Sequence, residues 1–243
     1  ELNGRKYSQL PQKVKEGIDR RQLSVITLLK ESSKTLIQEE EMKKMVFERL
    51  NTGGVTLEDQ EIRNALYNGP FNDLCILLSG NNTFRKLWFI NPDDIDGVDA
   101  ELDNYDDALK YAKNKLYKRM YDVELVLRYF AMRHIDEYSG KLSEFMDLCL
   151  RQGNNYTNEQ LELLKKIFEN TIEKANILFS DKAFCQFVKR RGTYSWTSPQ
   201  KMIYDSMMLA LSQIEINNNK IDLNSNIERL KKFYQENEDV FDG

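Results

Sequence analysis

The pattern of hydrophobic and polar positions is most regular between residues 42 and 67. Its first part predicts a helix with one apolar face, formed by Met42, Met45, Val46 and Leu50. Gly53 and Gly54 interrupt the helical spacing, because paired glycines readily adopt the positive φ angles that end a helix and turn the chain. The pattern therefore predicts a helix followed by a tight glycine turn.

A second helix is predicted directly after this turn. Thr56 is placed to cap it, and Glu58 and Asp59 fall in its first turn, where acidic side chains suit the positive end of the helix dipole. Its expected buried face consists of Leu57, Ile62, Ala65 and Leu66. Residues 46–67 together read as helix, turn and helix.

The rest of the chain is predicted to be mostly helical. Alternation and β-branched residues over 22–29 predict one strand, and the chain offers no obvious strand to pair with it. After the stop at Asn68-Gly69-Pro70, further helices are expected at 71–79, 83–89, 123–138, 141–151, 157–179, 181–189, 198–214 and from 225 onward. The predicted fold class is therefore mainly α.

Aspartates are concentrated between residues 91 and 107, which also contain Pro92 and Gly97. This density is compatible with a calcium loop, but the segment lacks the alternating aspartates, glycine and closing glutamate of an EF-hand. A solvated linker is the favoured interpretation.

Composition narrows the classes of protein to consider. The 243 residues carry a net charge of −4, which argues against a uniformly basic nucleic-acid binder but leaves room for a local basic groove. Cys75, Cys149 and Cys185 are an odd set without close spacing, so reduced thiols in a cytoplasmic protein are expected rather than disulfides or a zinc site. The sequence shows no apolar run of the ~20 residues that a membrane span needs, and no signal peptide.

The sequence contains no complete set of catalytic residues. His134 is the single histidine, which excludes metal nuclease sites built from several histidines within this chain. Serine, cysteine and zinc hydrolase motifs are missing, as is a phosphate loop of the Walker type. We therefore predict no catalytic and no metal-binding residue here.

Polar side chains crowd the predicted glycine turn: Arg49, Asn51, Thr52, Gln60, Glu61, Arg63 and Asn64. Exposed backbone amides next to guanidinium groups suit a phosphate or another anion. The alternative is a capped corner between two helices with solvated charges, since glycine turns commonly end helices.

A second candidate site combines cations with aromatic residues. Lys189, Arg190 and Arg191 precede Tyr194 and Trp196 in a stretch expected to be a loop. Cations and stacking aromatics suit a nucleic-acid backbone and an unstacked base. The alternative is a solvated charged surface.

The stretch FERLNTGGVTLEDQEIRNAL, residues 47–66, closely resembles the signature of a large prokaryotic family. This is the amino-terminal family of GmrSD-type (type IV) restriction systems, which has a ParB/sulfiredoxin-like fold. Phe47, Arg49, Asn51, Gly53, Gly54, Leu57, Gln60, Glu61, Ile62 and Arg63 all fall in register with the signature. The resemblance is weaker over residues 2–11, 121–131 and 233–243.

The chain departs from the family in one respect. Members carry an upstream Asp-Gly-Gln-Gln-Arg stretch, implied to be the main catalytic or nucleotide-binding element, and this sequence has none. We therefore expect a fragment: residues 1–68 as the remnant of a ParB/sulfiredoxin-like α+β domain, and residues 69–243 as an all-α domain.

The resemblance also implies a function. By it, Arg49, Asn51 and Arg63 would contact the phosphates of a nucleoside triphosphate with Mg²⁺, helped by the amides of Gly53 and Gly54. Gln60 and Glu61 would position Arg63 or a metal-bound water. The alternative is that Glu61 and Arg63 serve only local helix pairing.

The expected function is nucleotide-regulated DNA recognition or cleavage in a defence protein, with the fragment inactive alone. Expected partners are DNA, a nuclease domain or subunit, and a second copy of the chain through strand exchange at 22–29. The competing interpretation is a non-enzymatic helical interaction or scaffold module.

Overall fold

The protein is represented by a computed structural model, which describes residues 5–22, 36–50, 56–92, 111, 113–134, 136, 140–216 and 221–241. The chain divides into two compact units, residues 1–46 and 47–243. The boundary differs from the predicted one after residue 68, since α3 packs against α8 in the larger unit. The strand predicted over 22–29 and the aspartate-rich segment lie almost wholly outside the described residues.

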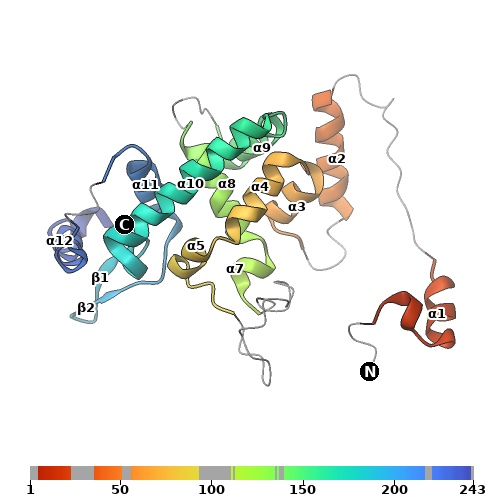
Figure 1. The fold of residues 1–243 in the computed structure, drawn as a ribbon, viewed down its shortest axis with the longest axis horizontal. Helices are drawn as coiled ribbons and strands as arrows, with labels where there is room; N and C mark the ends of the chain where they lie inside the picture. The colour runs from red at the N-terminus through yellow and green to blue at the C-terminus, as the bar shows by residue number, and fades with distance from the viewer. Residues whose placement is uncertain are drawn as a thin grey trace. The chain divides into compact units, whose positions relative to one another are not determined.

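The described elements confirm that the fold is mainly helical (Figure 1). The smaller unit contains η1 (Tyr7–Gln9) and α1 (Gln12–Asp19), and α2 (Leu36–Leu50) crosses the division between the units. The elements of the larger unit are α3 (Asp59–Leu66), α4 (Pro70–Ser79), α5 (Asn82–Leu87), α7 (Lys115–Lys118), α8 (Tyr121–Met132), α9 (Leu142–Gly153), α10 (Asn158–Phe179), η5 (Ser180–Lys182), β1 (Phe187–Arg190), β2 (Thr193–Trp196), α11 (Lys201–Ser212), α12 (Leu223–Glu236) and α13 (Glu238–Phe241).

Several helix ends are where the sequence predicts them. Pro70 is the first residue of α4, where its missing N–H costs nothing. Thr157 and Gln160 form the predicted capping box of α10, with the Gln160 N–H 3.3 Å from the Thr157 hydroxyl and the Thr157 N–H 2.9 Å from the Gln160 side chain. Such local signals fix where α4 and α10 begin.

The core of the larger unit is built around α8 and α10. Helix α8 packs against α4, α7, α9 and α11, and is buried along nearly its whole length because it is apolar on most faces. The rings of Phe84, Trp88, Phe168, Phe184 and Tyr204 form a connected aromatic cluster between α5, α10 and α11.

Polar contacts also join these helices. The guanidinium of Arg128 on α8 forms two hydrogen bonds with the carboxylate of Asp205 on α11. The ammonium of Lys201 lies 2.7 Å from Glu124, and the Tyr204 hydroxyl donates to the Leu125 carbonyl at 3.1 Å. Such contacts fix the register of α11 along α8.

The structure corrects the prediction that the helical domain contains no strands. Residues 187–196 form an antiparallel hairpin, in which Phe187 pairs with Trp196 and Arg190 with Thr193. The short helix expected over 181–189 is reduced to the single turn η5. Within the described part of the chain, no helix has both the length and the apolar character needed to cross a bilayer.

Candidate functional site

The predicted anion site around the glycine turn is only partly described. Arg49 is exposed in the last turn of α2, whereas Asn51, Thr52, Gly53 and Gly54 lie outside the described residues. Gln60, Glu61 and Arg63 all belong to α3. The structure therefore bears mainly on the α3 half of this site.

Arg63 is inside the protein, not at its surface. Its side chain is 3% exposed, and its Nε donates to the Asp147 carboxylate on α9 at 2.7 Å. Its Nη2 donates to the Ser143 hydroxyl at 2.6 Å, and Glu124 on α8 lies 3.8 Å from Nη1. The Asp59 carboxylate on the same helix lies 3.9 Å from Nη2. Three carboxylates and a hydroxyl thus surround the guanidinium, which favours a structural role over the predicted phosphate contact.

The neighbouring polar residues of α3 are also used locally. The Glu61 carboxylate accepts the Glu58 N–H at 2.8 Å and lies 3.2 Å from the Arg119 guanidinium, so it caps its own helix rather than positioning Arg63. Gln60 is fully buried, and its side-chain amide makes no hydrogen bond with the described part of the chain.

The buried face of α3 is therefore different from the predicted one. Ile62 is buried as expected, but Ala65 is exposed, and Gln60, Arg63 and Tyr67 at i, i+3 and i+7 face inward. Tyr67 is the residue whose position indicates this buried face in the sequence. It lies on the same side of the helix as Gln60 and Arg63, so a large aromatic residue marks that side although the other two residues are polar.

The predicted nucleic-acid site is a β-hairpin rather than a loop. Arg191 and Gly192 occupy its turn with φ angles of 50° and 83°, as in two-residue hairpin turns with positive φ at both positions. Lys189 and Arg190 end β1 just before this turn, and all three cationic side chains are exposed. The structure thus brings the three predicted cations together at one tip, and none of them forms an ion pair with another described residue.

The two aromatic residues of this site anchor the hairpin instead of forming a free stacking surface. Tyr194 stacks on Phe187 with ring centroids 5.3 Å apart, and its hydroxyl donates to the Glu238 carboxylate. Trp196 contacts Phe187 at 5.0 Å and Tyr234 of α12 at 6.3 Å between centroids. The base-stacking role predicted for Tyr194 and Trp196 is not supported by these contacts, because both half-buried rings pack against neighbouring aromatic rings.

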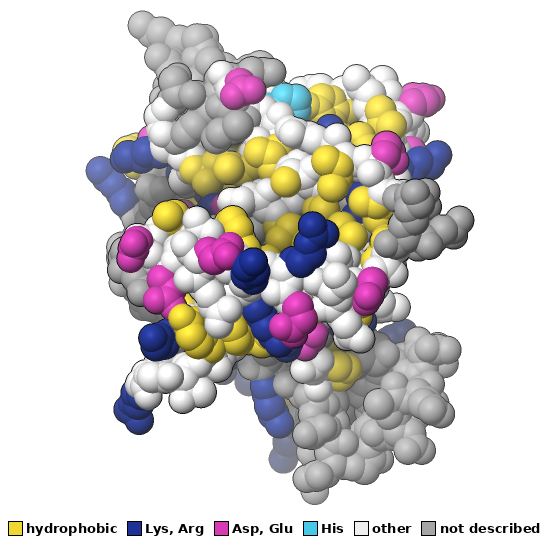
Figure 2. All heavy atoms as spheres, turned by 90° about the vertical axis from the view of Figure 1, so that its left-hand side faces the viewer, with side chains coloured by type: hydrophobic (Ala, Val, Ile, Leu, Met, Phe, Trp, Pro, Cys, Tyr) yellow, Lys and Arg dark blue, Asp and Glu magenta, His cyan; other side chains and the backbone are white. Residues whose placement is uncertain are grey.

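Figure 2 shows the side of the molecule that carries α12 and the hairpin. Lysine and arginine side chains are interspersed there with aspartate and glutamate, and hydrophobic side chains gather above them. Positive charge on this face is therefore local rather than general, which agrees with the net charge of −4.

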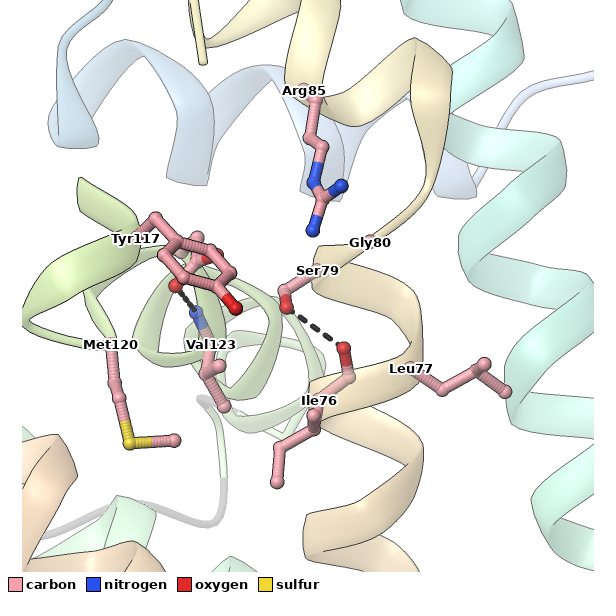
Figure 3. Close-up of a pocket in the computed structure, with 9 residues that line it drawn as sticks. Ile76, Leu77, Ser79, Gly80, Arg85, Tyr117, Met120 and Val123 are labelled. Carbon is pink, nitrogen blue, oxygen red and sulfur yellow. Dashed lines mark hydrogen bonds between the residues drawn. The ribbon is translucent and has the colours of Figure 1, made fainter. Parts of the chain in front are cut away.

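A pocket that the sequence analysis did not identify lies between α4, α5, α7 and α8 (Figure 3). It has a volume of about 550 Å³. Its walls are largely apolar and include Ile76, Leu77, Met120 and Val123. Volumes of this size are typical of small-molecule sites.

Two buried charges of opposite sign line this pocket. Arg85 is 8% exposed and its guanidinium carbon lies 4.2 Å from the ring centroid of Tyr111, a cation–π contact that orients it. Figure 3 shows the guanidinium pointing toward Ser79 and Tyr117. Asp122 is 1% exposed, and one of its oxygens accepts the Val123 N–H at 2.9 Å.

The carboxyl of Asp122 is electrostatically unusual. Burial raises its pKa to about 6, although the Val123 N–H and the positive charge of Arg85 oppose this shift. No local pattern in the sequence indicates this environment, because Arg85 is distant from Asp122 along the chain. A perturbed carboxyl in a pocket is a common property of functional sites.

The single histidine, His134, is exposed just after the end of α8. In comparisons with known proteins, no family model, curated protein or solved structure matched this chain.

Proposed function

We propose that this chain is a DNA-recognition module of a nucleotide-regulated prokaryotic defence protein, and that the β1–β2 hairpin contacts the DNA backbone. The observation that carries this proposal is the tip formed by Lys189, Arg190 and Arg191, three exposed cations on a two-stranded ribbon. The resemblance of residues 47–66 to the GmrSD-type family is the reason for proposing a defence protein and a ParB/sulfiredoxin-like remnant. The free thiols fit a cytoplasmic location.

The geometry of the hairpin suits duplex DNA. A two-stranded ribbon is narrow enough to enter the major groove, which is about 12 Å wide. Lys189 and Arg190 point to opposite faces of β1, since side chains alternate along a strand. Cations on both faces of one ribbon can reach the phosphates on both sides of a groove.

The aromatic anchor supports the same function. Phe187, Tyr194 and Trp196 hold the hairpin against α12 and α13, so the three cations are presented on a rigid element. Preorganisation of this kind lowers the entropy cost of binding. The stacking role first expected for the two aromatic residues is replaced by this supporting role.

A salt titration tests the proposal. Binding of a short duplex is measured by fluorescence anisotropy for the chain and for Lys189→Ala/Arg190→Ala/Arg191→Ala. Three phosphate contacts predict a slope of about −2.7 in log K against log[salt], and thus a roughly 40-fold loss of affinity between about 50 and 200 mM salt. The triple variant is expected to lose most of this slope.

The matched control removes three exposed cations elsewhere, with Lys166→Ala/Arg229→Ala/Lys232→Ala on α10 and α12. It should retain the slope of the unchanged chain. Equal slopes for the hairpin variant and the unchanged chain would contradict the proposal and favour the helical interaction or scaffold module.

Nucleotide regulation is a separate part of the proposal. It depends on Arg49 and the turn predicted from the sequence at residues 51–54, because Arg63 is paired with Asp147 and Ser143. Calorimetry with GTP, CTP and ATP in the presence of Mg²⁺, on the chain and on Arg49→Ala, tests it. Binding that Arg49→Ala abolishes is the expected result, and no binding by either protein would remove the nucleotide from the proposal.

A further inference from the structure

The surface between α4 and α10 carries an exposed leucine next to a hollow. Leu77 is 60% exposed, whereas the other two leucines of α4 are buried. A hollow of about 320 Å³ begins beside Leu77 and extends to Lys165 and Glu169 on α10. Figure 3 shows Leu77 pointing away from Tyr117 and Met120. The leucine therefore projects from α4 at the edge of this hollow.

The hollow has the composition of a protein–protein contact. Leu77 and Leu78 line its apolar part, and Asn82, Lys165 and Glu169 line its polar part. An apolar centre with a polar rim is the usual anatomy of an interface. A single exposed leucine is ordinary on a protein surface. Here, however, it adjoins a hollow that has room for a leucine side chain.

The two charged residues of the hollow are available to a partner. Lys165 and Glu169 are half-buried, and neither forms an ion pair or a side-chain hydrogen bond with another described residue. They lie four positions apart, on the same face of α10. A two-fold axis between them would make the α10 helices of two copies antiparallel, so that Lys165 faces the partner's Glu169 and Glu169 faces the partner's Lys165. The charges of this surface are therefore complementary to themselves.

The shape of the surface is complementary to itself in the same way. A surface that has both a projecting side chain and a hollow next to it matches a rotated copy of itself, as a two-fold interface requires. We propose that the surface of Leu77, Lys165 and Glu169 binds a second copy of this chain. Leu77 of each copy enters the hollow of the other, and two reciprocal ion pairs join the α10 helices.

This contact goes beyond the proposed DNA binding and does not depend on it, since the surface and the hairpin tip are on different elements. It also uses other residues than the strand exchange predicted at 22–29. Each of the three expectations can therefore fail without the others.

Sedimentation velocity over a range of protein concentrations tests the contact, and a monomer–dimer equilibrium is expected. Leu77→Glu should weaken dimerisation at least about tenfold, because it places a carboxylate in the partner's hollow. The matched control is Leu163→Glu, at a 58% exposed position on the opposite side of α10 from Lys165, which should dimerise as the unchanged chain does. A chain that stays monomeric at every concentration, or that dimerises equally well with Leu77→Glu, would overturn the proposal.

An exchange of the two charges tests the ion pairs. Lys165→Glu and Glu169→Lys should each weaken dimerisation at least about tenfold, because each places like charges opposite one another in both halves of the interface. Lys165→Glu/Glu169→Lys exchanges the two charges and restores both ion pairs, so most of the affinity should return. Thermal unfolding checks that every variant is folded. No recovery in the double variant, or a dimer that none of these changes affects, would reject this surface as the interface.

Discussion

At the scale of single residues, Arg63 and Asp122 are both buried charged groups, but they differ in whether a group of opposite charge lies close to them. Arg63 has a carboxylate 2.7 Å away and a hydroxyl at 2.6 Å, whereas Asp122 has a backbone N–H at 2.9 Å and no cation within ion-pair distance among the described residues. A buried charge without a close counter-ion destabilises the folded state. The ionised Asp122 carboxylate is therefore expected to lower the stability of the folded protein.

The first prediction follows from the raised pKa of Asp122. The folded carboxyl titrates at about 6 and the unfolded one near 3.8, so the folded state binds the proton more tightly. Stability from this group is fully present below pH 3.8 and is lost as the pH rises through about 6. At neutral pH the ionised carboxyl thus costs about 3 kcal/mol.

Asp122→Asn should therefore raise the free energy of unfolding at pH about 7 by up to about 3 kcal/mol, and by only about 1 kcal/mol at pH about 4.5. The amide oxygen can still accept the Val123 N–H. Urea unfolding of both proteins at the two pH values measures this. A variant less stable than the unchanged chain at neutral pH would contradict the prediction.

At the scale of elements, the hairpin shows why some structure could be predicted and some could not. Pro70 sets the first residue of α4, and the Thr157–Gln160 capping box sets the start of α10. Both are local signals in the sequence. The hairpin lacks the Asn-Gly or Asp-Gly pair that most strongly marks such turns, and its strands have only four residues each. Its stability comes from Phe187 and Trp196 packing on α12, which is distant along the chain.

The turn gives the second prediction. Arg191 adopts a positive φ of 50°, which asparagine tolerates better than arginine. Arg191→Asn should therefore stabilise the hairpin slightly, by a few tenths of a kcal/mol to about 1 kcal/mol. It also removes one cation, so the salt slope of DNA binding should fall by about 1. Thermal unfolding measures the change in stability, and anisotropy measures the change in DNA binding. Lower stability of the variant, even together with the expected weaker DNA binding, would contradict the prediction.

At the scale of the whole larger unit, two buried ionic contacts and a more exposed one connect four helices. Arg63 on α3 contacts Asp147 on α9 and Glu124 on α8, and Glu124 also contacts Lys201 on α11. Arg63 and Asp147 are 84 positions apart, so no local pattern could predict that Arg63 is buried. The pocket was missed for the same reason, because Arg85 and Asp122 come together only through the packing of α5 on the rest of the fold.

The third prediction tests whether Arg63 belongs to this network or to an anion site. Arg63→Ala should lower the free energy of unfolding by about 3–5 kcal/mol, because it leaves the buried Asp147 without this guanidinium. The control is Arg119→Ala, which breaks a more exposed ion pair with Glu61, a residue on the same helix as Arg63. This variant should lower the free energy of unfolding by about 1 kcal/mol or less.

A double-mutant cycle makes the test specific to the pair. If Arg63 and Asp147 stabilise each other, Arg63→Ala/Asp147→Ala should lose less than the sum of the two single variants, with a coupling of about 0.5–3 kcal/mol. A ligand-binding arginine would behave differently, since its removal tends to leave stability unchanged or higher. Additive losses of stability would contradict the prediction. So would a stable Arg63→Ala variant that no longer binds nucleotide, and either result would favour the predicted anion-binding role of Arg63 at the glycine turn.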